Sequence, residues 1–68
     1  MLRIEHELRK RGLSQAKAAR MSDVNESSMS RIVRGAEPAF PNRGQRIADA
    51  LGWKGHWQEL FEEIGGQR

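Results

Sequence analysis

Apolar residues recur along the chain with helical spacing, in five short segments separated by glycine, proline and small polar residues. The last segment is the clearest, because Trp57, Leu60, Phe61 and Ile64 follow the i, i+3, i+4, i+7 spacing of one helix face. No segment shows the period-two alternation of a half-buried strand. The sequence therefore predicts an all-α fold of five helices, over residues 2–11, 14–21, 26–34, 43–51 and 56–64.

The residues that precede three of these segments are typical helix caps. Ser14 and Asn25 are expected to be N-caps of the second and third helices. Asn42 precedes the fourth, with Gln45 three residues on, which resembles a capping box. The predicted core consists of Ile4, Leu8, Leu13, Ala19, Val24, Met29, Ile32, Ile47, Leu51, Trp53, Leu60, Phe61 and Ile64.

Length and composition favour a single domain over residues 1–68. A chain of 68 residues has too few side chains to fill a second core. It contains no cysteine, so neither a disulfide nor a thiolate metal site can hold the fold together. With 37% hydrophobic and 31% charged residues it is not polar enough to be read as disordered. A compact helical bundle with local contacts is the most economical solution.

The formal net charge of +3 is unevenly distributed along the chain. Residues 1–54 carry a net charge of +5, whereas residues 55–68 carry −2. Nine of the 12 basic residues are arginine, whose planar guanidinium suits phosphate and guanine recognition. Charge alone leaves two readings equally open, a nucleic-acid-binding protein and an ordinary solvated basic surface.

Several classes of protein receive no support from the sequence. No apolar run is long enough to span a membrane, and residues 1–5 do not resemble the start of a signal peptide, so a cytoplasmic location in a bacterial or phage-infected cell is expected. His6 and His56 have no cysteine or acidic pair at metal-ligand spacing, so no metal is expected. The serines between residues 14 and 30 lack a plausible histidine and carboxylate partner, so neither an enzyme nor a cofactor is predicted.

The stretch 13–35 has the requirements of a helix-turn-helix unit, at about residues 14–34. Ala19 is small where the two helices would cross, and the turn holds Asp23, which tolerates left-handed backbone, and the apolar Val24. The outward side of the helix over residues 26–34 would be entirely polar, as a helix in the DNA major groove requires, and would present Glu26, Ser27, Ser30, Arg31 and Arg34.

This pattern resembles the lambda-repressor-like family of the phage Cro/repressor or xenobiotic-response-element type. The resemblance covers about residues 2–54, and it is carried by Gly-Leu-Ser-Gln-Ala at 12–16, Ala19, Val24, Met-Ser-Arg-Ile at 29–32, Arg34-Gly35 and Ile-Ala-Asp-Ala-Leu-Gly at 47–52. It implies a compact five-helix bundle that binds double-stranded DNA.

The resemblance also implies roles for individual residues. The DNA bases would be read by Glu26, Ser27, Ser30 and Arg31, with Arg31 as the candidate for a bidentate contact to guanine. For Glu26 a first-turn acid favoured by the helix dipole is an equal alternative. DNA phosphates would be contacted by Ser14, Gln15, Lys17, Asn25, Arg34, Asn42 and Arg43. Gln15 could instead bridge to a base. For Lys17 and Arg34 the alternative is an ordinary solvated surface charge.

The sequence departs from the family in three places. Asp23 stands where the family has a turn glycine, and Ser22 stands where it has a large aliphatic residue, so Met21 is expected to fill that space. An arginine in the first helix and a glutamate in the third are replaced by Leu8 and Val33, which we therefore expect to contact one another.

The predicted function is a sequence-specific transcriptional regulator, a repressor or autoregulator of phage or mobile-element type that binds an operator as a homodimer. Trp57 and Phe61 are the candidate dimer contacts, although aromatic residues at helical spacing are more often core. The alternative is a protein-interaction module or an antitoxin, whose aromatic C-terminal helix binds a partner protein such as a toxin, a polymerase subunit or a recombinase.

Overall fold

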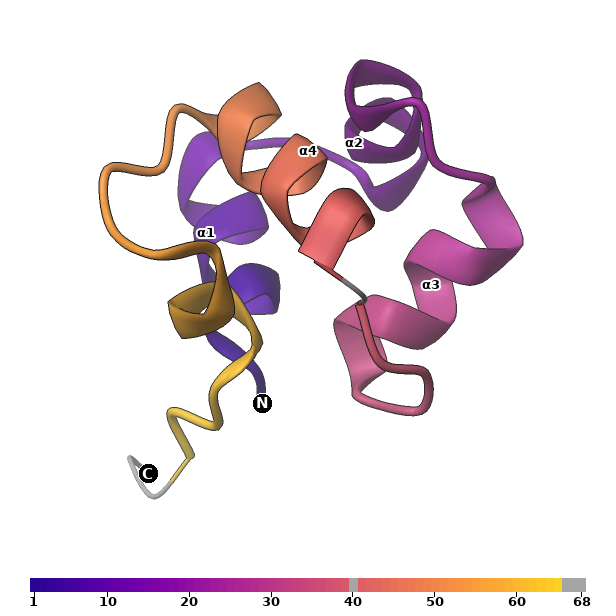
Figure 1. Cartoon of the computed structure of the whole chain (residues 1–68). Helices are drawn as coiled ribbons and strands as arrows, with labels where there is room; N and C mark the ends of the chain where they lie inside the picture. The colour runs from indigo at the N-terminus through magenta and orange to yellow at the C-terminus, as the bar shows by residue number, and fades with distance from the viewer. Residues whose placement is uncertain (40, 66–68) are drawn as a thin grey trace.

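Four α-helices and one short 3₁₀ helix make up the fold, in a computed structural model that describes residues 1–39 and 41–65 (Figure 1). They are α1 (Arg3–Arg11), α2 (Gln15–Ser22), α3 (Glu26–Arg34), α4 (Pro41–Leu51) and η1 (Trp57–Phe61). No strand is formed by these described residues, so the all-α prediction is confirmed. Within the same residues, no helix has the length and apolar character needed to cross a membrane.

The helices pack around one core, in a globule of 32 × 22 × 21 Å. α2 contacts both α3 and α4, while η1 rests on α1 and α4, so that the end of the described chain lies beside its start (Figure 1). The fully buried large side chains are Ile4, Met29, Ile32, Val33, Ile47 and Leu60.

Most of the predicted core is buried, and so are Leu8 and Val33, the two residues expected to replace an ion pair. Leu8 is 3% exposed and Val33 is fully buried, and both belong to the same cluster between the contacting helices α1 and α3. Four predicted core residues are only half-buried at its edge, namely Leu13, Trp53, Phe61 and Ile64.

The boundaries of α2 and α3 agree with the predicted capping residues. The Ser14 hydroxyl accepts a hydrogen bond from the Lys17 amide, and Asn25 Oδ1 accepts from the Ser27 amide at 2.8 Å. Between these helices Asp23 adopts the left-handed conformation, with φ 58° and ψ 45°. The turn therefore accommodates an aspartate where glycine would be the unstrained choice.

The fourth helix begins earlier than predicted, at Pro41 rather than after Asn42. Proline is favoured at the first helical position, because its fixed φ suits a helix and its missing N–H needs no partner there. Asn42 therefore lies inside the first turn, and the expected capping box is wrong. The Gln45 side chain instead donates to Asp49 Oδ1 one turn further on, at 2.9 Å.

The predicted α-helix over 56–64 is also wrong, because this segment is a 3₁₀ helix that ends at Phe61. Glu62 is already extended, with ψ 148°, and residues 62–64 run beside the start of the chain. The Arg3 amide donates to the Glu62 carbonyl, and the Ile64 amide donates to the Met1 carbonyl, each at 2.9 Å. This pairing holds the last apolar residues against α1 without a long helix.

Met21 does not fill the space beside Ser22, contrary to expectation. The Met21 side chain is 44% exposed, whereas Ser22 is 3% exposed at the end of α2. Among the described residues, Ser22 Oγ has no hydrogen-bond partner. A polar atom is therefore buried at the position where an aliphatic side chain was expected.

Candidate nucleic-acid interface

α3 has one apolar and one polar side, as the sequence predicted. Met29, Ile32 and Val33 are buried against the rest of the molecule. On the other side, the residues predicted to face DNA are exposed, except for the half-buried Ser30: they are Glu26, Ser27, Ser30, Arg31 and Arg34. α3 therefore offers a polar surface on a helix that is firmly anchored from behind.

The starts of α2 and α3 place their first amides at the surface, but the caps already use several of them. Asn25 accepts from the amides of Ser27 and Ser28, and Ser14 accepts from that of Lys17. Ser14 and Asn25 thus act primarily as helix caps, and any phosphate at these helix starts would have to use the remaining amides of the first turn. Ser14, Gln15, Lys17 and Asn25 are all exposed.

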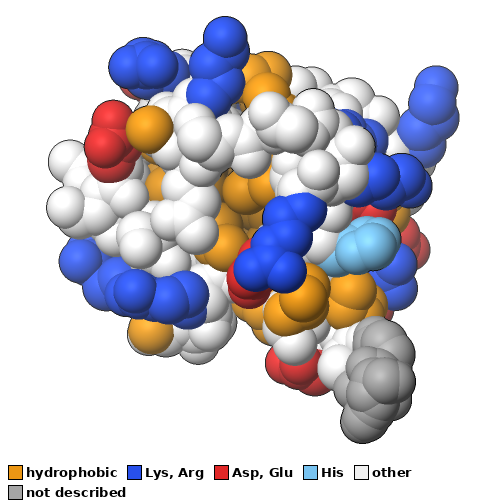
Figure 2. Space-filling view, turned by 180° about the vertical axis from the view of Figure 1, so that it is seen from behind, with side chains coloured by type: hydrophobic (Ala, Val, Ile, Leu, Met, Phe, Trp, Pro, Cys, Tyr) orange, Lys and Arg blue, Asp and Glu red, His pale blue; other side chains and the backbone are white. Residues whose placement is uncertain are grey.

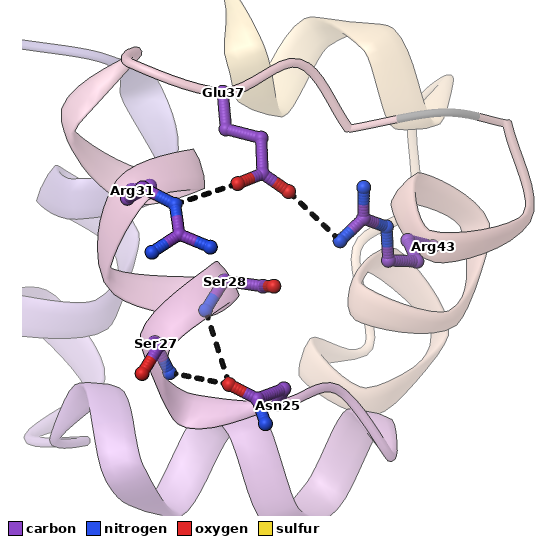
Figure 3. A network of polar contacts seen from close by, with 6 residues as sticks. All are labelled: Asn25, Ser27, Ser28, Arg31, Glu37 and Arg43. Carbon is purple, nitrogen blue, oxygen red and sulfur yellow. Dashed lines mark hydrogen bonds and ion pairs between the residues drawn. The ribbon is translucent and has the colours of Figure 1, made fainter.

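Glu37, which was not among the predicted site residues, lies between two that were (Figure 3). Its Oε1 accepts a hydrogen bond from Arg31 Nε at 2.7 Å, and its Oε2 pairs with Arg43 Nη1 at 3.1 Å. Arg31 belongs to α3 and Arg43 to α4, so one carboxylate links the two helices through the loop between them. Glu37 is six residues from each arginine, a spacing that signals nothing in the sequence alone.

The two arginines hold the pKa of Glu37 below its ordinary value of 4.5. The hydrogen bond from Arg31 is the largest cause, and the hydrogen bond from Arg43 and the charges of both guanidinium groups act in the same direction. Partial burial opposes them, because it disfavours the charged carboxylate. Glu37 is therefore ionised at neutral pH and balances part of the positive charge of this region.

The guanidinium of Arg31 is bound through one of its nitrogens and remains partly accessible to solvent. Its Nε donates to Glu37, and its two terminal nitrogens lie at the end of the guanidinium beyond Nε (Figure 3). The side chain is 48% exposed, whereas those of Arg43 and Glu37 are 23% and 24% exposed. Arg31 thus combines a fixed orientation with access to an external partner.

The other predicted phosphate contacts are less closely connected. Arg34 and Asn42 are exposed on α3 and α4, and the structure gives neither of them a link to the Arg31–Glu37–Arg43 group. Basic side chains also occur elsewhere: on the face seen in Figure 2 they form several separate groups with apolar atoms between them. Charge on this face therefore does not single out one patch, and the candidate interface is defined by the polar side of α3 and its neighbours.

Trp57 and Phe61, the predicted dimer contacts, pack on each other with ring centroids 6.0 Å apart and rest against the core. Both remain half-buried and line a cleft of about 470 Å³, together with Leu2, Ile32, Pro38 and Ala39 among others. Trp57 thus has a packing role within one copy of the chain. Its role in a dimer stays a prediction.

The two histidines lie on different elements, one at the start of η1 and one on α1. His56 caps η1, because its Nδ1 accepts from the Gln58 amide at 3.1 Å, and its ring stacks on Trp57. His6 is exposed on α1. Over residues 1–39 and 41–65, no three histidine, aspartate or glutamate side chains are grouped so that they could hold a metal ion.

Comparisons with known proteins do not assign this chain to a family. No protein-family model, no curated protein and no solved structure matches it.

Proposed function

We propose that the protein is a small sequence-specific regulator that binds double-stranded DNA, with α2 and α3 as a helix-turn-helix of the lambda-repressor-like type. α3 would lie in the major groove and the start of α2 would face the backbone. By covering an operator within a promoter, the protein would exclude polymerase and act as a repressor or autoregulator of phage or mobile-element type.

The observation that carries this proposal is the two-sided character of α3. Its inner side is locked into the core through Met29, Ile32 and Val33, and its outer side is polar and bears Arg31 and Arg34. A short turn that contains a left-handed Asp23 joins it to α2, and the two helices contact each other. A rigid helix with a polar, arginine-bearing outer side is what reading of base edges requires.

Selection of bound sites from a random double-stranded DNA library tests the proposal. We expect an enriched sequence, and a palindrome within it would support binding as a homodimer. Affinity for that sequence should fall steeply as salt is raised, because arginine–phosphate contacts release counterions. Absence of binding to any DNA at low salt would refute the proposal.

Two substitutions and one control sharpen the test. Arg31→Ala should cost roughly 1–3 kcal/mol on the selected site and relax the preference at one base pair. Arg34→Ala, as a phosphate contact, should weaken binding to all sequences alike and reduce the salt slope by about one. Lys10→Ala removes the same charge from an exposed position on α1 and should leave the base preference unchanged.

The second candidate is a protein-interaction module or an antitoxin, favoured by the half-buried Trp57 and Phe61 at the edge of a cleft. Aromatic side chains that are only partly buried are common at protein interfaces. The salt titration separates an interaction module from the regulator, because the module would show no DNA binding even at low salt. Sedimentation of the free protein and of its DNA complex tests whether these aromatics also support a homodimer.

A further inference from the structure

Glu37 is fixed to Arg31 through its backbone as well as its side chain. The amides of Ala36 and Glu37 both donate to the Arg31 carbonyl at the end of α3, at 2.8 and 3.3 Å. The Glu37 carboxylate also accepts a hydrogen bond from Nε of the same arginine, at 2.7 Å, and pairs with Arg43 of α4. The loop after α3 is thereby folded so that an acid lies beside the residue proposed to read a base.

An acid in this place is unfavourable for DNA binding taken by itself. It neutralises part of the positive charge of Arg31 and Arg43, and it would repel a nearby phosphate. The link that Glu37 makes between α3 and α4 is one benefit that offsets the lost attraction, and the geometry of the guanidinium indicates a second.

Arginine reads guanine by donating two parallel hydrogen bonds, to O6 and N7. The hydrogen bond to Glu37 is made by Nε, so the end of the Arg31 guanidinium that carries its two terminal nitrogens is not the donor in that bond (Figure 3). A free arginine side chain carries about 2 kcal/mol of rotamer entropy, much of which is lost when it docks on a base. Holding the guanidinium in advance reduces that loss for one orientation and disfavours others.

We propose that Glu37 is a positioning residue that orients Arg31 for a guanine contact, so that it lowers the affinity for DNA in general and raises the selectivity for one base pair. The proposal rests on the DNA-binding function proposed above. The competing explanation is that Glu37 only competes with phosphates for the two arginines and has no effect on selectivity.

The experiment compares wild type with Glu37→Gln on three DNA duplexes: the selected site, the same site with the Arg31-dependent base pair replaced, and a random sequence. That base pair is first identified as the one whose preference is lost in Arg31→Ala. Glu62→Gln is the matched control, because Glu62 is an exposed acid in the segment after η1, outside α3 and α4. The urea midpoints of all variants are measured alongside, so that lost folding is not mistaken for lost selectivity.

For Glu37→Gln we expect severalfold tighter binding to random DNA, together with a loss of about tenfold in discrimination at that one base pair, within the range of a bidentate contact. Discrimination at other positions should be unchanged. Adding Glu37→Gln to Arg31→Ala should cause no further loss at that base pair, because the arginine to be positioned is gone. Glu62→Gln should leave discrimination as in wild type.

Equal tightening on all three duplexes, with discrimination preserved, would overturn the positioning role and leave Glu37 as a competitor for phosphate. A uniform loss of binding without loss of folding would overturn it as well. If wild type itself binds no duplex at low salt, the DNA-binding proposal fails, and this result is distinguishable from both of the others.

Discussion

The indole ring of Trp57 lies directly on Gly44, where η1 packs against α4. A Cβ atom at position 44 would overlap Cε3 of the indole and come within 2.7 Å of Cζ3. Gly44 is buried in the interior of α4, a position where glycine usually weakens a helix. The close approach of the aromatic ring explains why this helix has no side chain there.

Gly44→Ala is therefore expected to destabilise the protein, although the same change stabilises most helices by about 1 kcal/mol. Overpacking costs about 1–3 kcal/mol, which outweighs the gain in helix propensity. Urea unfolding followed by circular dichroism measures the balance. In a Trp57→Leu background the same change should become neutral or stabilising, and a clear gain in stability in the wild-type background would show that the ring does not occupy this space.

The two serines at the ends of α2 should respond to alanine in opposite ways. Ser14 caps the helix, so Ser14→Ala should lower the free energy of unfolding by about 1 kcal/mol. Ser22 buries a hydroxyl without a partner among the described residues, so Ser22→Ala should raise it by about 1 kcal/mol. Denaturation midpoints of the two variants serve as controls for each other, and a loss of stability in Ser22→Ala would indicate that the hydroxyl is satisfied in solution.

Asp23 has a left-handed backbone conformation, which is unfavourable for a residue with a Cβ atom. Asp23→Ala is expected to lose about 1 kcal/mol, because alanine lacks the short polar group that makes this conformation tolerable. Asp23→Asn should stay within about 0.5 kcal/mol of wild type, since asparagine also tolerates this region. Thermal unfolding of the three proteins provides the ranking, and equal stability of all three would contradict the expected cost.

The pKa of Glu37 gives a prediction on pH. Because the folded state lowers this pKa below 4.5, the carboxylate stabilises the fold above the ordinary glutamate range, and this contribution is lost as pH falls through the lowered value. The stability difference between wild type and Glu37→Gln should thus be largest near neutral pH and close on acidification. In an NMR titration, Arg31→Gln should raise the Glu37 pKa more than Arg43→Gln does, since the Arg31 hydrogen bond is the largest cause.

The features of the fold that depend only on residues adjacent in the sequence could be predicted from the sequence. The caps at Ser14 and Asn25 and the left-handed Asp23 all follow from local backbone chemistry, and each is present. The start of α4 differs from the prediction, because proline both interrupts helices and suits their first position, and Pro41 has the second role here.

The remaining features depend on contacts between distant parts of the chain. The spacing of Trp57, Leu60, Phe61 and Ile64 fits a helix, but pairing of residues 62–64 with the N-terminal segment draws the chain into an extended path instead. Glu37 joins the candidate site only because the loop after α3 folds back onto Arg31. Neither the pairing nor the fold-back leaves a periodic signal in the sequence.

The pairing of Leu2 with Glu63 has a consequence for how the molecule folds. This pairing holds the segment that contributes the fully buried Leu60. The core is therefore complete only when the segment after η1 pairs with the start of the chain. Closing so long a loop is slow compared with forming the local helices. We therefore expect docking of η1 to be a late folding event that is also reversed first, so that the Arg3 and Ile64 amides exchange with solvent before those of the core helices and without unfolding of the whole domain.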